Sequence, residues 1–456
     1  MTFFLPPVNE TALTFDNTLN EPTPTCMKHR YPYYLLILAL VLNSCLPQID
    51  FQDSIFLPLK TQRFVAIGDG YTAGVANKGW SADPGAGISP EFQRMSYPNL
   101  LASAFNPGGE SAFRQPLVTG NGGYQQLKSY YPHDCAGVQP LPAIEWVPGQ
   151  AGGVTVPSLG TVDNLGVPGL RLSDWLATSP PDAANPAFFD ALVKPQTHLL
   201  GMVSAQEADF FSLWLGMEDL TQYAASGAAF PYRQPVDPNE FAQRIDTLIS
   251  LILARNPGSR VLVANLPDIT LFPYFQHMPH LYQESQECVR IQKNLFIETD
   301  QGVRIASPED LILLPAQKVL GQPVGSEMLG LTAAHPLADS LVLDEMEVIE
   351  IKQLLVAYNQ AIETVVNARR GRAFIELVDL NRYFGKMANG PVVVDGIQLS
   401  RDYLTGDVFS LDGLTLAPRG TAWMVNEFIR AINGFSALGA RLSTLNLSDY
   451  QGITFP

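Results

Sequence analysis

The sequence predicts an α/β fold in which a parallel central sheet is covered by helices on both faces. Short apolar runs that end at a glycine or a polar residue alternate with longer segments of helical periodicity, the pattern of βαβ units. The composition agrees, because 46% of the 456 residues are apolar and only 16% are charged, which allows one large core with loop-rich insertions. In such sheets ligands bind at the carboxyl ends of the strands.

The strands and helices follow from local signals. Buried strands are predicted at 63–69, 208–216, 260–265 and 373–378, where apolar residues run without interruption. Helices are predicted at 96–105, 239–255, 343–368 and 417–432, and the second of these has Asp237-Pro238 as a start signal and Pro257-Gly258 as a stop signal. Residues 106–162 are rich in glycine and proline and are predicted to be irregular.

Charge and cysteine content exclude several classes of function. The formal net charge is −16, and nucleic-acid binding needs clustered Lys and Arg, so no nucleic-acid partner is expected. The cysteines are Cys26, Cys45, Cys135 and Cys288, and none forms a CxxC pair of the kind found in zinc and thioredoxin sites. A bond between Cys135 and Cys288 cannot be read from spacing, and we favour unpaired core thiols.

The N-terminal region has the pattern of an export signal. Met27 is followed by three basic or weakly basic residues, an apolar stretch at 34–42, and the sequence Leu42-Asn43-Ser44-Cys45. The apolar stretch is too short to span a bilayer, so it indicates a signal peptide. The ending resembles the lipobox of bacterial lipoproteins, which implies lipidation of Cys45 and anchoring in the cell envelope, at the outer membrane. The alternative is an ordinary secretory signal with a chance cysteine.

This interpretation divides the chain into five parts. Residues 1–26 are an extension before the natural start or a disordered segment, 27–45 are the signal peptide with Cys45, and 46–61 are a tether. A single domain occupies 62–436, and a C-terminal tail occupies 437–456.

Four sequence blocks in order resemble those of SGNH, or GDSL, hydrolases, in particular the exported bacterial lipoprotein branch. They are FVAIGDGYTAG at 64–74, NLGVPGLRL at 164–172, FFSLWLGMED at 210–219 and SLDGLTLAPRGTAWMVNEFIRAIN at 410–433. The resemblance implies a three-layer α/β/α SGNH fold of the flavodoxin-like kind.

The same resemblance assigns the catalytic positions, and most carry the wrong residue. The nucleophile position is Gly70, the asparagine position is Glu218 and the histidine position is Thr415, whereas the oxyanion-hole glycine Gly166 and the triad aspartate Asp412 are retained. Glycine has no side chain to attack a carbonyl and threonine is no base near neutral pH. An ionised Glu218 about 4 Å from an oxyanion would repel it by about 4 kcal/mol at an effective dielectric constant near 20. No catalytic site is therefore expected to be intact.

The leading hypothesis is accordingly a pseudoenzyme that binds a glycan, a lipid or another envelope protein. Its alternative is hydrolysis of acyl esters of carbohydrates or lipids by a residual or relocated mechanism. A weaker alternative is glycoside cleavage by Glu218 and Asp412, which needs two carboxylates across a sugar-sized groove.

Carboxylates also gather at the predicted pocket, where the binding candidates are Asp69, Gly166, Glu218, Asp219 and Asp412. Such an oxygen-rich cluster could bind a divalent cation such as Ca²⁺. We favour the reading without a metal or other cofactor, in which Asp69 binds backbone amides, Asp219 caps a helix and Glu218 points out of the pocket.

Overall fold

The computed structural model describes residues 63–75, 93–106, 113–119, 124–130, 134–138, 142–147, 153–155, 162–435 and 441–453. All of them belong to one compact unit, Phe56–Pro456. The predicted extension at 1–26, the signal peptide with Cys45 and the tether at 46–61 lie outside the described residues.

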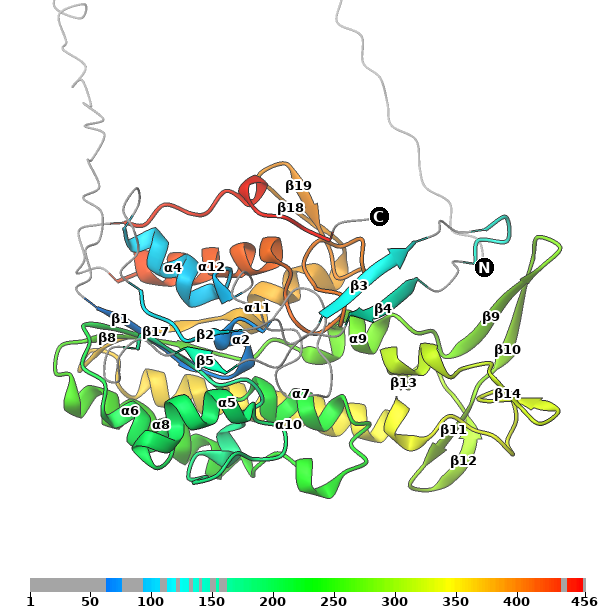
Figure 1. Ribbon diagram of the computed structural model, residues 1–456, viewed down its shortest axis with the longest axis horizontal. Coiled ribbons are helices and arrows are strands. Elements are labelled where there is room, and N and C mark those ends of the chain that lie inside the picture. The colour runs from blue at the N-terminus through cyan, green and yellow to red at the C-terminus, as the bar shows by residue number, and fades with distance from the viewer. Residues whose placement is uncertain are drawn as a thin grey trace, which may run out of the picture. The chain divides into compact units, whose positions relative to one another are not determined.

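A parallel sheet of five strands forms the centre of this unit (Figure 1). In chain order the strands are β1 (Phe64–Gly68), β6 (Asn164–Gly166), β7 (Phe210–Trp214), β8 (Arg260–Ala264) and β17 (Phe374–Val378). Their spatial order is β17-β8-β7-β1-β6, which is the flavodoxin-like order 2-1-3-4-5 read from the other edge. The four predicted strands are confirmed, and β6 is a short edge strand that apolar periodicity alone does not reveal.

Helices cover both faces of the sheet, which confirms the three-layer architecture. One face carries α4 (Tyr97–Phe105), α11 (Leu380–Gly385) and α12 (Pro418–Asn433), and the other carries α6 (Leu199–Ser204), α8 (Pro238–Arg255) and α10 (Glu345–Asn367) (Figure 1). The side chain of Asp237 accepts the Asn239 N–H at the start of α8, as its position before a proline predicts. Asp344 and Glu347 form a reciprocal capping box at the start of α10.

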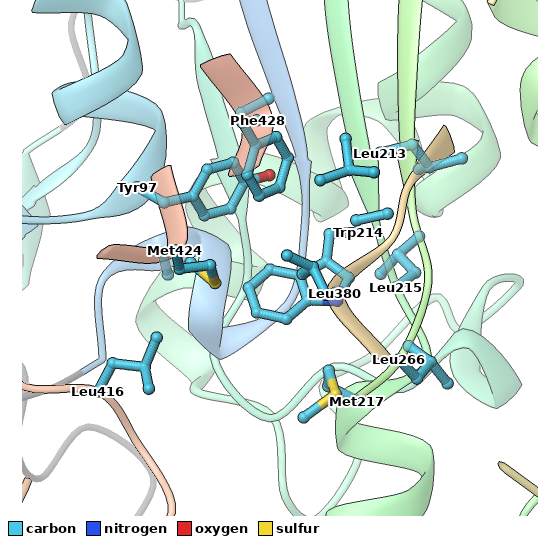
Figure 2. Close-up of a cluster of buried hydrophobic side chains, with 14 of the residues drawn as sticks. Tyr97, Leu213, Trp214, Leu215, Met217, Leu266, Leu380, Leu416, Met424 and Phe428 are labelled. Atoms are coloured by element: carbon cyan, nitrogen blue, oxygen red, sulfur yellow. The ribbon is translucent and has the colours of Figure 1, made fainter. Parts of the chain in front are cut away.

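The core beside β7 is aromatic, and it reaches the carboxyl end of the sheet through Trp214. Tyr97 stacks on Phe428 with ring centroids 4.7 Å apart, and its hydroxyl lies 3.1 Å from Ser212 Oγ. Figure 2 shows Trp214 among these side chains, and its ring centroid lies 5.3 Å from that of Tyr71. Burial of large aromatic side chains makes this packing a main contributor to stability.

Two insertions depart from the parallel pattern. Between α9 (Pro273–Gln276) and α10, antiparallel ribbons pack around a second, smaller apolar cluster that includes Leu295, Ile297 and Ile312. These ribbons include β9 (Leu281–Gln286) with β10 (Val289–Asn294), and β11 (Phe296–Thr299) with β12 (Gly302–Ile305). The region predicted to be irregular also contains ribbons: β2 (Leu117–Val118) pairs with β5 (Val154–Thr155), and β3 (Tyr124–Ser129) with β4 (Ala143–Val147).

A disulfide joins the two insertions, so the expectation that Cys135 and Cys288 are unpaired is wrong. Their Cα atoms lie 5.1 Å apart although 153 positions separate them in the sequence. Cys288 lies in the tight turn between β9 and β10 at a φ of 63°. Arg290 on β10 supports the junction, because its guanidinium donates to the carbonyl oxygens of Ala136 and Gly137 at 3.3 and 2.5 Å.

The described part of the predicted tail, residues 441–453, packs onto the domain. Asn426 and Asn433 on α12 exchange hydrogen bonds with the backbone of Leu445 and Leu442. Leu442 and Leu447 are buried in the main core. In the described part of the chain, no helix has the length and apolar character needed to cross a bilayer.

Candidate functional site

The candidate site lies between β1 and β7, where the order of the sheet reverses. Strand β1 ends at Gly68, and the chain turns through Asp69 into the short helix α2 (Gly70–Ala73). Asp69 is fully buried, and its carboxylate accepts the Tyr71 N–H at 3.1 Å and the Glu218 N–H at 3.4 Å. The prediction that Asp69 binds backbone amides is confirmed, and this side chain therefore joins the loops that follow β1 and β7.

The loop after β7 brings two further carboxylates to the site. Gly216 has a φ of 107°, and a Cβ there would lie 2.8 Å from the Phe241 ring, so glycine suits this turn. Helix α7 (Met217–Ala224) begins directly afterwards with Glu218 and Asp219 in its first turn. Asp219 accepts the N–H groups of Leu172 and Ser173 at 2.7 and 3.0 Å, which confirms that it caps a helical turn, the one at 172–174.

Glu218 points into the site, so the expectation that it points away is wrong. Its carboxylate accepts the Gly169 N–H at 3.3 Å and the Gln222 Nε2–H at 3.0 Å. A Cβ built on Gly70 would lie only 2.7 Å from Glu218 Oε1. Glu218 therefore occupies the space that a side chain at position 70 would need.

Burial dominates the electrostatics of this cluster. It raises the pKa of Asp69 well above the ordinary value, and the neighbouring Glu218 carboxylate raises it further. Burial also raises the pKa of Glu218, although hydrogen bonds from Gln222 and from the Gly169 and Gly70 amides lower it. Two adjacent buried carboxylates are costly when both are charged, so the cluster favours retaining a proton. A protonated Glu218 would not repel an oxyanion as an ionised carboxylate would, so the obstacle that this side chain presents to a reacting group is mainly steric.

The loop before α12 supplies the third side of the site, and Asp412 organises it. Asp412 Oδ1 accepts Ser410 Oγ–H and the Leu414 and Thr415 N–H groups at 2.8 to 2.9 Å, and Oδ2 accepts Thr415 Oγ1–H at 2.8 Å. The Thr415 hydroxyl also lies 2.6 Å from Ser410 Oγ. Thr415 thus bonds to the aspartate as a histidine there would, but it brings no base.

These three loops enclose very little space. The cavity between them is about 20 Å³, room for one water molecule and not for an ester or a sugar ring. Among the described residues, this cavity offers no sugar-sized groove between Glu218 and Asp412 of the kind that glycoside cleavage needs. The lining residues are Gly70, Tyr71, Val75, Glu218, Thr221, Leu414 and Thr415.

The structure thus brings three predicted site positions, Gly70, Glu218 and Thr415, to one cavity. Gly166 lies beside them on β6, but Asn164 Oδ1 accepts its N–H at 3.0 Å. A Cβ on Gly166 would lie 2.2 Å from the Ala73 nitrogen, so this glycine permits close packing of β6 against α2.

Two residues of the site were missed by the sequence reasoning. Gln222 stands four positions after Glu218 on the same face of α7, a spacing that could have revealed it. Gly169 is the second glycine of NLGVPGLRL, and nothing local indicates that its amide would meet α7. Among the described residues, no group of three or more His, Cys, Asp or Glu side chains is arranged to hold a metal ion.

Sequence comparison identifies the family of this domain. The profile of the family described as GDSL-like lipase/acylhydrolase matches residues 64–428, from β1 into α12. The chain belongs to the GDSL-like lipase/acylhydrolase family. The resemblance inferred from the four blocks is thereby confirmed, together with the α/β fold that it implies.

Solved structures of lipolytic enzymes are similar to this GDSL-like domain at low identity. An extracellular lipase from Streptomyces rimosus is 12% identical with a TM-score of 0.33, and the match covers 82% of this chain and 99% of that one. Phospholipase A1 from Streptomyces albidoflavus NA297 is 15% identical with a TM-score of 0.30, covering 82% and 98%. Comparison with curated proteins finds no match. The family assignment rests on the profile.

Proposed function

We propose that this GDSL-like domain is a pseudoenzyme that has lost ester hydrolysis and acts by binding a ligand or partner. The observation that carries the proposal is that the Glu218 carboxylate lies directly beside Gly70. A Cβ on residue 70 would lie 2.7 Å from Glu218 Oε1. A serine at position 70 would therefore displace the Glu218 carboxylate from its place in the site.

The chemistry of acyl transfer supports this reading. Such a reaction needs an activated nucleophile, a base within hydrogen-bond reach and free donors aimed at the developing oxyanion. Here position 70 has no side chain, Thr415 is bonded to Asp412, and the amides of Gly166 and Gly169 already have acceptors within the protein. A cavity of about 20 Å³ leaves no room for an ester substrate.

Ester hydrolysis by a restored variant tests the proposal. The triple variant Gly70→Ser, Glu218→Asn, Thr415→His and the purified natural protein are compared on short-chain nitrophenyl esters and acetylated sugars. We expect no hydrolysis above background from the natural protein and measurable turnover from the variant. The matched control carries Gly70→Ala with the same two other changes, and it must remain inactive because it has no nucleophile.

Hydrolysis by the natural protein would overturn the proposal in favour of the alternative, an esterase acting on acylated carbohydrates or lipids by a relocated mechanism. Repeating the assay with Tyr71→Phe and Thr415→Val would then show whether a hydroxyl of this cavity takes part.

We also propose that the domain is exported and anchored to the bacterial envelope through a lipid on Cys45. The Cys135–Cys288 disulfide supports export, because such bonds persist mainly in oxidising compartments. The test is incorporation of a labelled fatty acid in cells that express the natural chain or Cys45→Ala. Label in the natural chain alone supports the anchor, and label in neither indicates an ordinary secretory signal.

A further inference from the structure

A second hollow lies at the carboxyl edge of the same sheet, away from the GDSL-like pocket. It is a groove of about 510 Å³ between α10 and the loops that follow β8 and β17. Small-molecule sites are usually clefts of about 300–1,000 Å³, and in open α/β sheets they lie at this edge. Twelve described residues line the groove, among them Lys352, Val356 and Glu363 on α10 and Asn265, Asp379 and Asn381 on the two loops.

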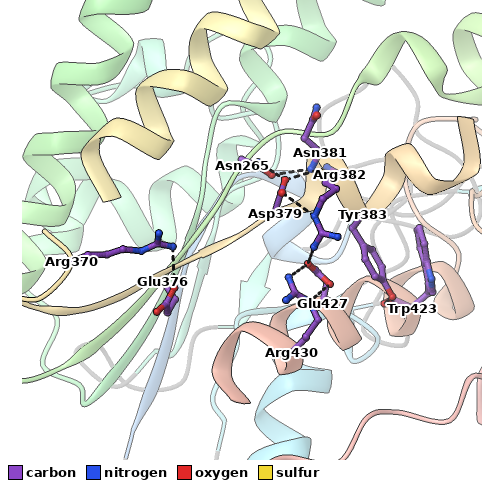
Figure 3. A network of polar contacts seen from close by, with 10 residues as sticks. All are labelled: Asn265, Arg370, Glu376, Asp379, Asn381, Arg382, Tyr383, Trp423, Glu427 and Arg430. Atoms are coloured by element: carbon purple, nitrogen blue, oxygen red, sulfur yellow. Dashed lines mark hydrogen bonds and ion pairs between the residues drawn. The ribbon is translucent and has the colours of Figure 1, made fainter. Parts of the chain in front are cut away.

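Interlocked amides hold the floor of the groove in place. Asn265 Nδ2–H donates to Asp379 Oδ1 at 2.8 Å, and Asn265 Oδ1 accepts the Asn381 N–H at 2.9 Å (Figure 3). Asn359 on α10 exchanges two hydrogen bonds of 2.8 Å with the backbone of Leu266. The two loops and the helix are therefore tied together before any ligand arrives, which lowers the entropy cost of binding.

The arginine at one end of the groove is also held. Arg382 Nε donates to Asp379 Oδ2 at 3.2 Å, and its guanidinium faces the fully buried Glu427 carboxylate at 3.5 Å (Figure 3). Arg430 pairs with the same carboxylate. Arg382 is thus neutralised by its partners and does not by itself make the groove an anion site.

The α10 side of the groove presents polar side chains that no other described residue binds. The side chains of Lys352, Gln360 and Glu363 are exposed and make no hydrogen bond or ion pair with other residues in the described ranges. Val356 stands among them on α10 and is 54% exposed. An apolar surface surrounded by unused donors and acceptors suits a ligand that has both a C–H face and polar edges.

The chemistry of the lining selects among ligands. Nine of the twelve residues are polar, so a lipid chain fits poorly. Asp268, Glu363 and Asp379 would repel a phosphate. Hydroxyl groups both donate and accept hydrogen bonds, so they match a mixture of amides, carboxylates and a lysine.

We propose that this groove binds a saccharide. The C–H face of the sugar packs on Val356, and its hydroxyls bond to Lys352, Glu363 and the amides of the floor. This site is separate from the cavity at Gly70, so the inference stands or fails independently of ester hydrolysis.

Binding of three sugar classes tests the proposal. Hexoses, N-acetylhexosamines and hexuronic acids are offered at about 10 mM in saturation-transfer NMR, and titration calorimetry then measures the affinity of any that bind. We expect at least one class to bind the natural protein and Lys352→Ala/Glu363→Ala to weaken that binding by about tenfold. Val356→Ala should weaken it as well, because the apolar contact is lost.

Matched controls remove the same groups elsewhere. Lys318→Ala/Glu309→Ala makes the same two changes on exposed side chains outside the groove, and Met346→Ala removes an exposed apolar side chain of α10 outside it. Both should bind as the natural protein does. The proposal is overturned if none of the three sugar classes binds, or if the groove variants bind as well as the controls.

Discussion

Two hollows lie at the carboxyl edge of one sheet, and they differ in what their polar groups do. At the end of β1 and β7 the carboxylates turn inward: Asp69, Glu218 and Asp412 bind groups of the protein itself, and about 20 Å³ remains. At the end of β8 and β17 about 510 Å³ is open, and the exposed polar side chains of α10 that line it bind no other residue in the described part of the chain. The position of a site follows from the sheet order, but its use depends on whether side chains fill it.

Side-chain length accounts for much of the difference. Glu218 is long enough to reach from the first turn of α7 to the amide of Gly169 in the loop after β6, and its carboxylate thereby takes up space in the pocket. The loops after β8 and β17 instead carry the shorter Asn265, Asp379 and Asn381, which bond to each other and leave the space above them free. We therefore expect substitutions in the first hollow to change stability, and substitutions of the exposed α10 side chains in the second hollow to change binding alone.

The largest effect is expected at Asp412. Asp412→Ala leaves several buried donors of one loop without an acceptor, which should lower the free energy of unfolding by about 3 kcal/mol. Denaturant unfolding measures the loss. Asp402→Ala is the control, since among the described residues this exposed carboxylate of a nearby loop bonds only to Ser400, and its loss should cost less than about 1 kcal/mol. Equal losses would mean that Asp412 does not organise the pocket.

The contact between position 70 and Glu218 should give the next largest effect. Gly70→Ala places a Cβ against the Glu218 carboxylate and should cost about 1–3 kcal/mol. The cost should nearly vanish in a Glu218→Ala background, and a double-mutant cycle measures that coupling. Gly385→Ala, where the added Cβ meets no atom within 4 Å, should be neutral or slightly stabilising. Additive losses would contradict the steric coupling.

A pH dependence should be visible at Glu218. Burial raises the pKa of Glu218 in the folded state. At a pH just above the ordinary glutamate pKa, the unfolded chain has therefore lost a proton that the folded chain still holds. That stability is fully present at low pH and is lost as the pH rises through the folded-state pKa. Glu218→Gln stays neutral, so its free energy of unfolding relative to that of the natural protein should be higher at about pH 8 than at about pH 4. Unfolding curves at both pH values test this, and a constant difference would refute it.

The smallest effect on stability is expected in the groove. Lys352→Ala and Glu363→Ala remove exposed side chains that hold no other described residue, so each should change the free energy of unfolding by less than about 0.5 kcal/mol. Thermal and denaturant unfolding of the variants measure this. A loss of unfolding free energy as large as that of Asp412→Ala would show that these side chains stabilise the fold, which would contradict the distinction between the two hollows.

Local signals were sufficient for most of the fold. Helix α8 begins where Asp237 and Pro238 predict, β1 ends at Gly68, and β7 ends two residues before Gly216. Features that depend on a distant partner could not be predicted from the sequence. The disulfide joins Cys135 to Cys288 across 153 positions, and the short strand β6 owes its place to pairing with β1. The antiparallel ribbons within 106–162 were missed for the same reason.

The candidate site likewise combines features that the sequence predicts with features that only the tertiary structure shows. The sequence by itself determined that the family's nucleophile, amide and base positions hold Gly70, Glu218 and Thr415, and that all three follow strands or precede a helix at one edge of a sheet. Only the tertiary structure decided that Glu218 points inward and bonds to Gly169, and that α10 leaves a groove beside Asn265 and Asp379. The physical reason is range: caps and strand ends depend on neighbours in the chain, whereas the direction of a side chain and the space beside it depend on segments that meet only when the sheet is assembled.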